Sequence, residues 1–160
     1  MSRPPARIRH IAIASKDPAK AAEFFKNALG WKEIARRAPN TEAKPADHPG
    51  NRAITLTDGH INISLIRFSV DQIGRGADYE GLHHVGVVVN DVDEWTPRLE
   101  ALGSPLIAGK DAIPPGAHFE IKFRGPDNVV FDISDRPWPG SAPVEAGELE
   151  ADSDAPVTAR

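Results

Sequence analysis

Two histidines occupy equivalent positions in an internal repeat and are the first candidates for chemistry. His10 lies seven residues before Asp17, and His84 lies seven residues before Asp91. Each imidazole offers a ring nitrogen that can ligate a metal ion or move a proton. The chain of 160 residues contains no cysteine, which excludes disulfides, thiolate nucleophiles and zinc or iron–sulfur sites with sulfur ligands. A metal ion in this protein would therefore be bound by His, Asp, Glu or Asn.

The repeat also predicts the elements that position these histidines. RHIAIASKDPAKAAEFFKNALG begins at Arg9 and HHVGVVVNDVDEWTPRLEALG begins at His83. Both copies run from an alternating strand pattern, through an Asp, into a helix pattern that ends in Leu-Gly. Asp17 and Asp91 are expected to cap the two helices. Pro97 is expected to delay or kink the second helix, because proline lacks the amide hydrogen that a helix interior needs.

Three further strand patterns follow each helix. They cover residues 31–35, 53–57 and 60–68 in the first half, and residues 105–108, 118–123 and 129–134 in the second. Each half therefore has the order βαβββ. We expect one α+β domain made of two such modules, at about residues 7–70 and 81–138, because 160 residues are too few for two ordinary domains.

Alternation places polar side chains together on one face of two of these strands. The residues on these faces are His60, Asn62 and Ser64 in the first half, and His118, Glu120 and Lys122 in the second. Glu120 and Lys122 are the best candidates for a catalytic acid or base, since proton transfer needs a titratable group within hydrogen-bond reach. His83 alternates with His84, so we expect it to point the other way, at a strand edge.

The loops and the C-terminus have a different composition. Residues 36–52 are rich in Pro and Asn and are expected to form a mobile flap, in which His48 is a solvated loop residue. Residues 71–81 join the modules, and residues 109–117 form a third loop. Residues 139–160 are expected to be an acidic disordered tail, because they hold too few large apolar groups to offset the chain entropy.

The distribution of charge bears on partners. The net charge is −4, and residues 141–160, with five acids and one base, account for all of it. The remaining 140 residues hold 18 basic and 18 acidic side chains, so we expect no basic stripe for nucleic acid. The apolar run near the N-terminus is too short for a signal peptide, and no apolar stretch is long enough to span a membrane. A cytoplasmic protein that does not bind membranes is therefore expected.

In this order of motifs, the chain resembles the vicinal oxygen chelate superfamily, which includes glyoxalase I, methylmalonyl-CoA epimerase, extradiol dioxygenases and the bleomycin resistance proteins. The resemblance covers about residues 7 to 138. It rests on the two repeat copies and on GPDNVVFDISD, which is similar to the family's Asp-Pro-Asp-Gly turn followed by a strand with an acid. The resemblance implies a cup-shaped mixed sheet with helices outside, and it makes a homodimer plausible.

The resemblance also implies a divalent metal, Fe, Zn or Mn, held from the first and last strands of each module. The matching positions are His10, His84 and Asp132, while the fourth position falls on Ser64, where many relatives have Glu or Gln. Asn62 lies on the same face, two residues earlier. Two imidazoles and one carboxylate leave coordination positions open for a substrate or water.

Three functions fit this site. The first is a metal-dependent lyase or isomerase, similar to glyoxalase or an epimerase, that acts on a small oxygen-chelating substrate. The second is an extradiol dioxygenase with a His-His-Asp iron site, although the tyrosine of those enzymes falls here on Lys122. The third is a metal-free small-molecule or drug-binding protein of the bleomycin-resistance kind. The sequence favours the first slightly and does not identify the substrate.

Overall fold

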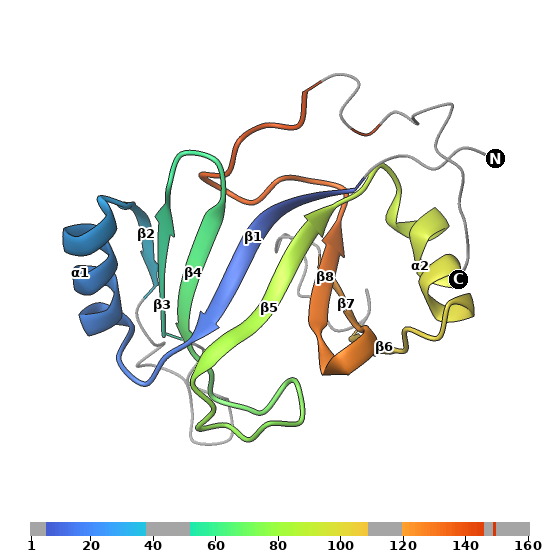
Figure 1. The fold of residues 1–160 in the computed structure, drawn as a ribbon, viewed down its shortest axis with the longest axis horizontal. Helices are drawn as coiled ribbons and strands as arrows, with labels where there is room; N and C mark the ends of the chain where they lie inside the picture. The colour runs from blue at the N-terminus through green and yellow to red at the C-terminus, as the bar shows by residue number, and fades with distance from the viewer. Residues whose placement is uncertain (1–5, 38–51, 109–119, 146–148, 150–160) are drawn as a thin grey trace.

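The structure is a computed structural model that describes residues 6–37, 52–108, 120–145 and 149. One eight-stranded mixed sheet lies between two helices, with the strand order β2-β3-β4-β1-β5-β8-β7-β6 (Figure 1). The first module contains β1 (Arg7–Ala14), α1 (Pro18–Leu29), β2 (Lys32–Arg37), β3 (Arg52–Thr57) and β4 (Asn62–Arg67). The second contains β5 (Gly81–Val88), α2 (Val92–Ala101), β6 (Leu106–Ala108), β7 (Ile121–Arg124) and β8 (Val130–Ser134). The expected fold of two βαβββ modules is confirmed.

The two modules meet along their first strands. β1 pairs with β5 in antiparallel orientation, while β1 pairs in parallel with β4 and β5 pairs in parallel with β8. The same neighbours recur in both modules, so the repeat in the sequence is a repeat in space. This pairing brings His10 on β1 and His84 on β5 to the middle of the sheet, where each is about 3–5% exposed.

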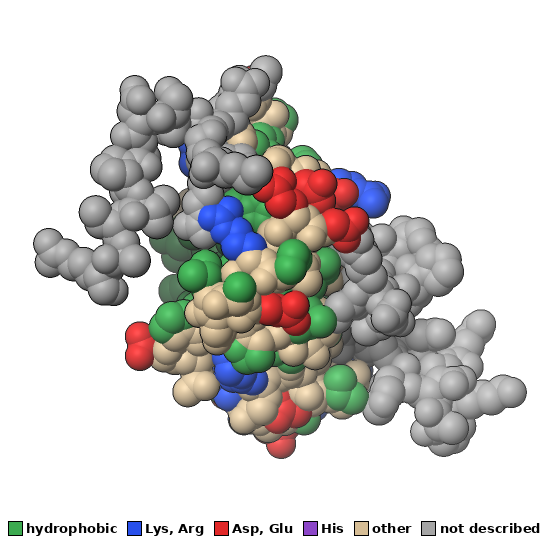
Figure 2. Space-filling model, turned by 90° about the vertical axis from the view of Figure 1, so that its right-hand side faces the viewer, with side chains coloured by type: hydrophobic (Ala, Val, Ile, Leu, Met, Phe, Trp, Pro, Cys, Tyr) green, Lys and Arg blue, Asp and Glu red, His purple; other side chains and the backbone are tan. Residues whose placement is uncertain are grey.

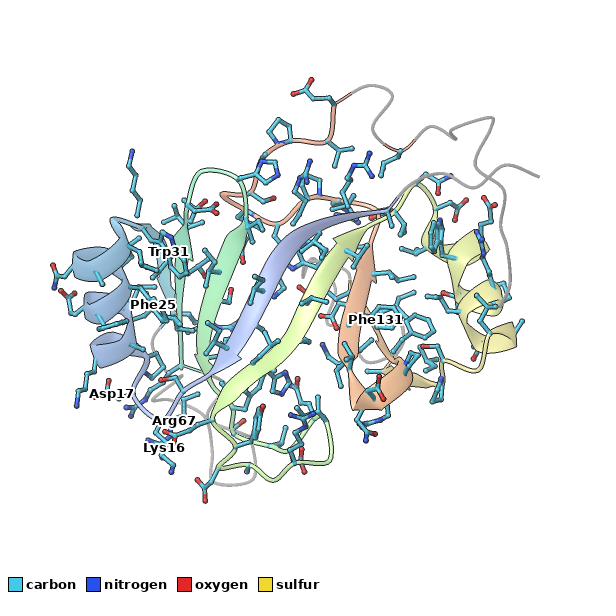
Figure 3. All side chains as sticks on the ribbon, in the orientation of Figure 1. Lys16, Asp17, Phe25, Trp31, Arg67 and Phe131 are labelled. Atoms are coloured by element: carbon cyan, nitrogen blue, oxygen red, sulfur yellow. The ribbon has the colours of Figure 1, made fainter. Side chains whose placement is uncertain are left out.

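Helix α1 packs against the first module. Asp17 caps it by accepting a hydrogen bond from the Lys20 amide at 3.0 Å, and Gly30 ends it with a left-handed φ of 71°. Ala22 is buried in the core against the sheet. Figure 3 shows Phe25 and Trp31 between the helix and the strands, with their rings stacked 4.9 Å apart.

Helix α2 packs against the second module and starts at its expected cap. Asp91 accepts hydrogen bonds from the Asp93 and Glu94 amides. The helix runs from Val92 to Ala101 with Pro97 inside it, so the proline neither delays its start nor divides it. Buried apolar residues from the helix and sheet form the second core cluster; they are Val89, Val92, Ile121, Phe123 and Ile133. On the face that carries α2, hydrophobic, acidic and basic side chains are interspersed (Figure 2).

Several segments named above lie outside the described residues. They are residues 38–51 with His48, residues 109–119 with His118, and residues 150–160 of the tail. Residues 139–142, by contrast, pack on the first module: the Ala142 amide donates to the His60 carbonyl at 2.9 Å. The packed part of the chain therefore extends at least to Ala142. No helix in the described part of the chain is long and apolar enough to cross a membrane.

The segment that joins the modules is organised by one carboxylate. Asp71 Oδ1 accepts hydrogen bonds from the amides of Ile73, Gly74 and Arg75, at 2.8 to 3.1 Å, and Oδ2 accepts one from Gly76 at 2.7 Å. These bonds, of which that of Gly76 has the largest effect, lower the pKa of Asp71. The Asp71 carboxylate thus satisfies four backbone amides that belong to no helix or strand.

We expect Asp71→Ala to loosen this segment, because it removes all four acceptor bonds at once. The melting temperature should fall and proteolysis at residues 71–81 should accelerate, whereas Asp78→Ala, at an exposed position of the same segment, should change neither. Because the folded-state pKa of Asp71 lies below the ordinary value of 3.8, its contribution is full above about pH 4 and is lost as the pH falls further. Equal proteolysis of both variants would contradict the assignment.

Candidate metal and acid–base site

A cavity of about 830 Å³ opens on the concave side of the sheet. Both modules line it, the first with His10, Asn62 and Ser64 and the second with His84, Glu120 and Lys122. The structure therefore brings together most of the residues singled out in the sequence. His60 is not among the lining residues; it is exposed, and its Nε2 lies 3.4 Å from an Arg9 guanidinium nitrogen.

His10 and His84 line this cavity, and the fully buried Asp132 contacts His84. His10 Nε2 lies 3.3 Å from His84 Nε2, and His84 Nε2 lies 3.1 Å from Asp132 Oδ2. Two ligand atoms that each lie about 2.1 Å from one ion are separated by about 3.0–3.4 Å. Both distances fall in this range. Among the described residues, the ligand atoms of His84, Glu120 and Asp132 all lie within 4.8 Å of one another, and His10 joins this group through its contact with His84.

The orientation of His10 is fixed by Asn62. Asn62 Nδ2 donates to the Pro139 carbonyl at 2.6 Å, so Asn62 Oδ1 faces His10 and accepts a hydrogen bond from Nδ1, also at 2.6 Å. With its proton on Nδ1, neutral His10 presents the lone pair of Nε2 to the site. Ser64, at the family's fourth ligand position, donates to Asn62 Oδ1 at 3.1 Å. Ser64 thus supports the residue that orients His10.

His83 differs from the expectation of a strand-edge histidine. It is buried, its ring stacks on Phe68 at 3.9 Å, and its Nδ1 lies 2.8 Å from Nδ1 of His84. The reason is a register shift: Ala12 pairs with His84 and Ile13 with Leu82, so His83 is an extra residue in β5. Such a bulge breaks the strict alternation of side chains between faces. His83 can therefore orient the ring of His84.

Asp132 is completely buried and holds its two oxygens in different environments. Oδ1 accepts a hydrogen bond from Lys122 Nζ, the residue directly opposite on β7. Oδ2 has no hydrogen bond of good geometry among the described residues. Burial alone would raise the pKa of Asp132, but His84 and the Lys122 ammonium outweigh burial and hold that pKa below its ordinary value. The carboxylate is therefore ionised, with one oxygen left for a cation.

These observations fit a divalent metal ion. The Oδ2 oxygen of Asp132 lies 3.1 Å from His84 Nε2, and Glu120 adds a ligand atom that lies within 4.8 Å of those of His84 and Asp132. Burial, and then the neighbouring His84, lower the pKa of His10 to about 3, and burial lowers the pKa of His84 as well. Both imidazoles are neutral at pH 7, which is the form that ligates metals.

Glu120 is the titratable group with the most useful placement. It lies just before β7, lines the cavity and accepts a hydrogen bond from the Trp138 indole at 2.6 Å. Burial, followed by the negative charge of Asp132, raises the pKa of Glu120 to about 7. A carboxyl group with a pKa near neutrality can both accept and return a proton.

Trp138 and His83 are the residues of the site that sequence reasoning did not place there. Trp138 lies outside both copies of the repeat, and no periodic pattern marks it. Alternation predicts that His83 points to the opposite face, and the bulge interrupts this alternation. The bulge leaves no signal in the sequence.

Comparison with known proteins agrees with the fold. Residues 7–133 match the family model described as the Glyoxalase/Bleomycin resistance protein/Dioxygenase superfamily. The chain therefore belongs to this superfamily, the vicinal oxygen chelate proteins. No curated protein matches the chain.

Solved structures with the same fold include methylmalonyl-CoA epimerases. One from Streptomyces coelicolor, a variant in complex with 2-nitronate-propionyl-CoA, superposes with a TM-score of 0.58 at 17% identity and covers 79% of this chain and 94% of its own. The enzyme from Mycobacterium tuberculosis gives 0.55 at 20% identity, covering 82% and 88%. A hypothetical protein from Bacillus halodurans gives 0.58 at 20%, covering 80% and 92%. At these identities the likeness shows the shared fold.

Proposed function

We propose that this protein is a metal-dependent isomerase or lyase that moves a proton next to a carbonyl group of a small, oxygen-chelating substrate. The observation that carries the proposal is the contact of His84 with both His10 and Asp132 beside a cavity that Glu120 also lines. Epimerases of the same fold, which act on a carbonyl compound bound as a coenzyme A thioester, support this reaction class.

The chemistry of each side chain at the site determines the role proposed for it. His10, His84 and Asp132 would hold the ion, and Glu120 takes a proton from the substrate carbon and returns it. The bound ion supplies positive charge that stabilises an oxyanion developing on the substrate. Lys122 keeps Asp132 ionised through its hydrogen bond and adds a second positive charge beside the reacting group. The cavity wall also has an apolar part, which includes Ile66 and Phe68.

The proposal is tested by hydrogen exchange in heavy water. The protein is loaded with Mn²⁺ or Co²⁺ and incubated with a panel of small carbonyl compounds that begins with methylmalonyl-CoA. We expect deuterium to enter the carbon next to the carbonyl of the true substrate. Glu120→Gln should slow this exchange by about 10²–10⁴-fold, because it removes the proton acceptor and keeps the side chain's shape.

Glu94→Gln, on the exposed side of α2, is the matched control and should exchange at the wild-type rate. A wild-type rate in Glu120→Gln would mean that another group moves the proton. Purified protein that binds none of Fe²⁺, Mn²⁺, Co²⁺ or Zn²⁺ would overturn the metal-dependent function and favour a metal-free binding protein.

The second candidate, a ring-cleaving dioxygenase, is favoured by one observation: the ligand set is two histidines and one carboxylate, as in many non-haem iron oxygenases. It predicts that the Fe²⁺-loaded protein consumes oxygen when catechol is added. Oxygen uptake that is lost in Asp132→Ala would favour this function over the isomerase. Deuterium exchange without oxygen uptake would favour the isomerase.

A further inference from the structure

Trp138 reaches the candidate site from a part of the chain beyond the family match. The match ends at Ile133, and Trp138 follows in the segment after β8. It belongs to no helix or strand, yet it is only 4% exposed. Its burial is therefore a property of this chain's own C-terminal segment.

The indole contacts two functional groups that come from different modules. Its ring stacks on the ring of His10, with centroids 4.9 Å apart and an angle of 8° between the planes. Its Nε1 donates a hydrogen bond to Glu120 Oε1 at 2.6 Å. One rigid side chain thus contacts a candidate metal ligand on β1 and the candidate base before β7.

The hydrogen bond also distinguishes the two oxygens of Glu120. An indole nitrogen can only donate, so Oε1 must accept, and the carbonyl-type oxygen of a neutral carboxyl group is the better acceptor. Trp138 therefore anchors the Oε1 oxygen of Glu120.

The sheet provides the space for this indole at Gly86. Gly86 pairs with His10 across β1 and β5. A Cβ atom at this position would lie 2.7 Å from His10 Cβ and 2.7 Å from two carbons of the Trp138 ring, closer than such atoms approach. The absence of a side chain at Gly86 is thus what allows Trp138 and His10 to stack.

The segment around Trp138 is anchored to the first module by four hydrogen bonds. Asn62 Nδ2 donates to the Pro139 carbonyl at 2.6 Å, and Thr57 Oγ1 donates to the Gly140 carbonyl at 2.7 Å. The other two join the Ala142 amide to the His60 carbonyl and Arg9 Nε to the Ala142 carbonyl. In Figure 1 this segment follows β8 and passes the ends of β1 and β4. The end of the second module is therefore held by the first.

We propose that Trp138 is a positioning residue that fixes the His10 ring and the Glu120 carboxylate relative to each other, so that metal ligand and base are aligned across the two modules. The inference rests on the proposed function, because it concerns the same ion and the same base. Trp138 itself neither ligates the ion nor transfers a proton.

The test uses the full-length protein and Mn²⁺ alone as the probe. Trp138→Leu should weaken Mn²⁺ binding by about 10–100-fold, the usual effect of losing a group that orients a ligand. Trp138→Phe keeps a ring to stack on His10 and should retain most of the affinity. Trp95→Leu, which removes an indole from α2, is the control and should bind as the wild type does. Trp138→Leu that binds Mn²⁺ as tightly as the wild type overturns the inference.

Amide NMR supplies a second measurement that a merely structural role would not affect. The three tryptophans give three indole N–H signals. Glu120→Gln should move the Trp138 signal alone, because it replaces the carboxyl acceptor of that indole N–H by an amide, and Mn²⁺ should broaden that signal before those of Trp31 and Trp95. A Trp138 signal that Glu120→Gln leaves in place overturns the link to Glu120.

These experiments distinguish failure of the proposed function from failure of the positioning role of Trp138. A wild-type chain that binds no metal overturns the proposed function and the His10 half of this inference, while the indole signal in Glu120→Gln still decides the Glu120 half. A wild-type chain that binds Mn²⁺ with equal affinity in Trp138→Leu leaves the proposed function in place and overturns the positioning role.

Discussion

Asp132→Asn is expected to lower the free energy of unfolding of the metal-free protein by about 3–5 kcal/mol, because it leaves the ammonium of Lys122 buried without its counter-ion. Lys122 is 8% exposed and Asp132 is fully buried, so the ammonium loses its partner in a largely desolvated position. Urea denaturation in the presence of a chelator measures the effect without a contribution from bound metal.

The double variant Asp132→Asn/Lys122→Met tests whether the stability loss comes from the unpaired charge of Lys122. Removing both charges should restore much of the stability lost in the single variant, since no uncompensated charge remains. Glu33→Gln is the matched control: Glu33 pairs with Lys26 and Arg36 at the surface, and breaking an exposed pair should have little effect. A small loss in Asp132→Asn would show that the pair is not desolvated.

His84→Ala is expected to abolish stoichiometric binding of Mn²⁺ or Co²⁺, with affinity reduced by at least about a hundredfold. His84 Nε2 lies within 3.1–3.3 Å of both Asp132 and His10, so its loss removes the central ligand of the set. Isothermal titration or elemental analysis after anaerobic purification measures the change. His10→Ala should act in the same direction.

His60→Ala is the control for both histidine variants, because His60 is exposed and lies outside the cavity lining. It should bind metal as the wild type does. Far-ultraviolet circular dichroism should be the same for all three variants, since the side chains of His10 and His84 face the cavity. Full metal content in His84→Ala would mean that the ion, if bound, lies elsewhere.

The distribution of side chains on the described surface bears on the partners of the protein. The described surface around α2 mixes acidic, basic and apolar side chains (Figure 2). The cytoplasmic location, the homodimer and the absence of nucleic-acid binding remain predictions.

The sequence by itself determined the modules. Period-two alternation in Arg7–Ala14 and Gly81–Val88, and the capped helices that follow Asp17 and Asp91, are local patterns. Local patterns specify an element from neighbouring residues alone. Recurrence of the whole pattern then predicts that His10 and His84 are equivalent, and the pairing of β1 with β5 places His10 opposite Gly86 and His84 opposite Ala12.

Only the tertiary structure decided how the site is completed. The register shift at His83 places His83 Nδ1 2.8 Å from His84 Nδ1, and the antiparallel pairing of β7 with β8 places Lys122 against Asp132. Trp138 reaches His10 from 128 positions further along the chain. These contacts depend on bulges, on cross-strand register and on a space left by Gly86. Their physical basis is packing between segments distant in sequence, which composition and periodicity do not encode.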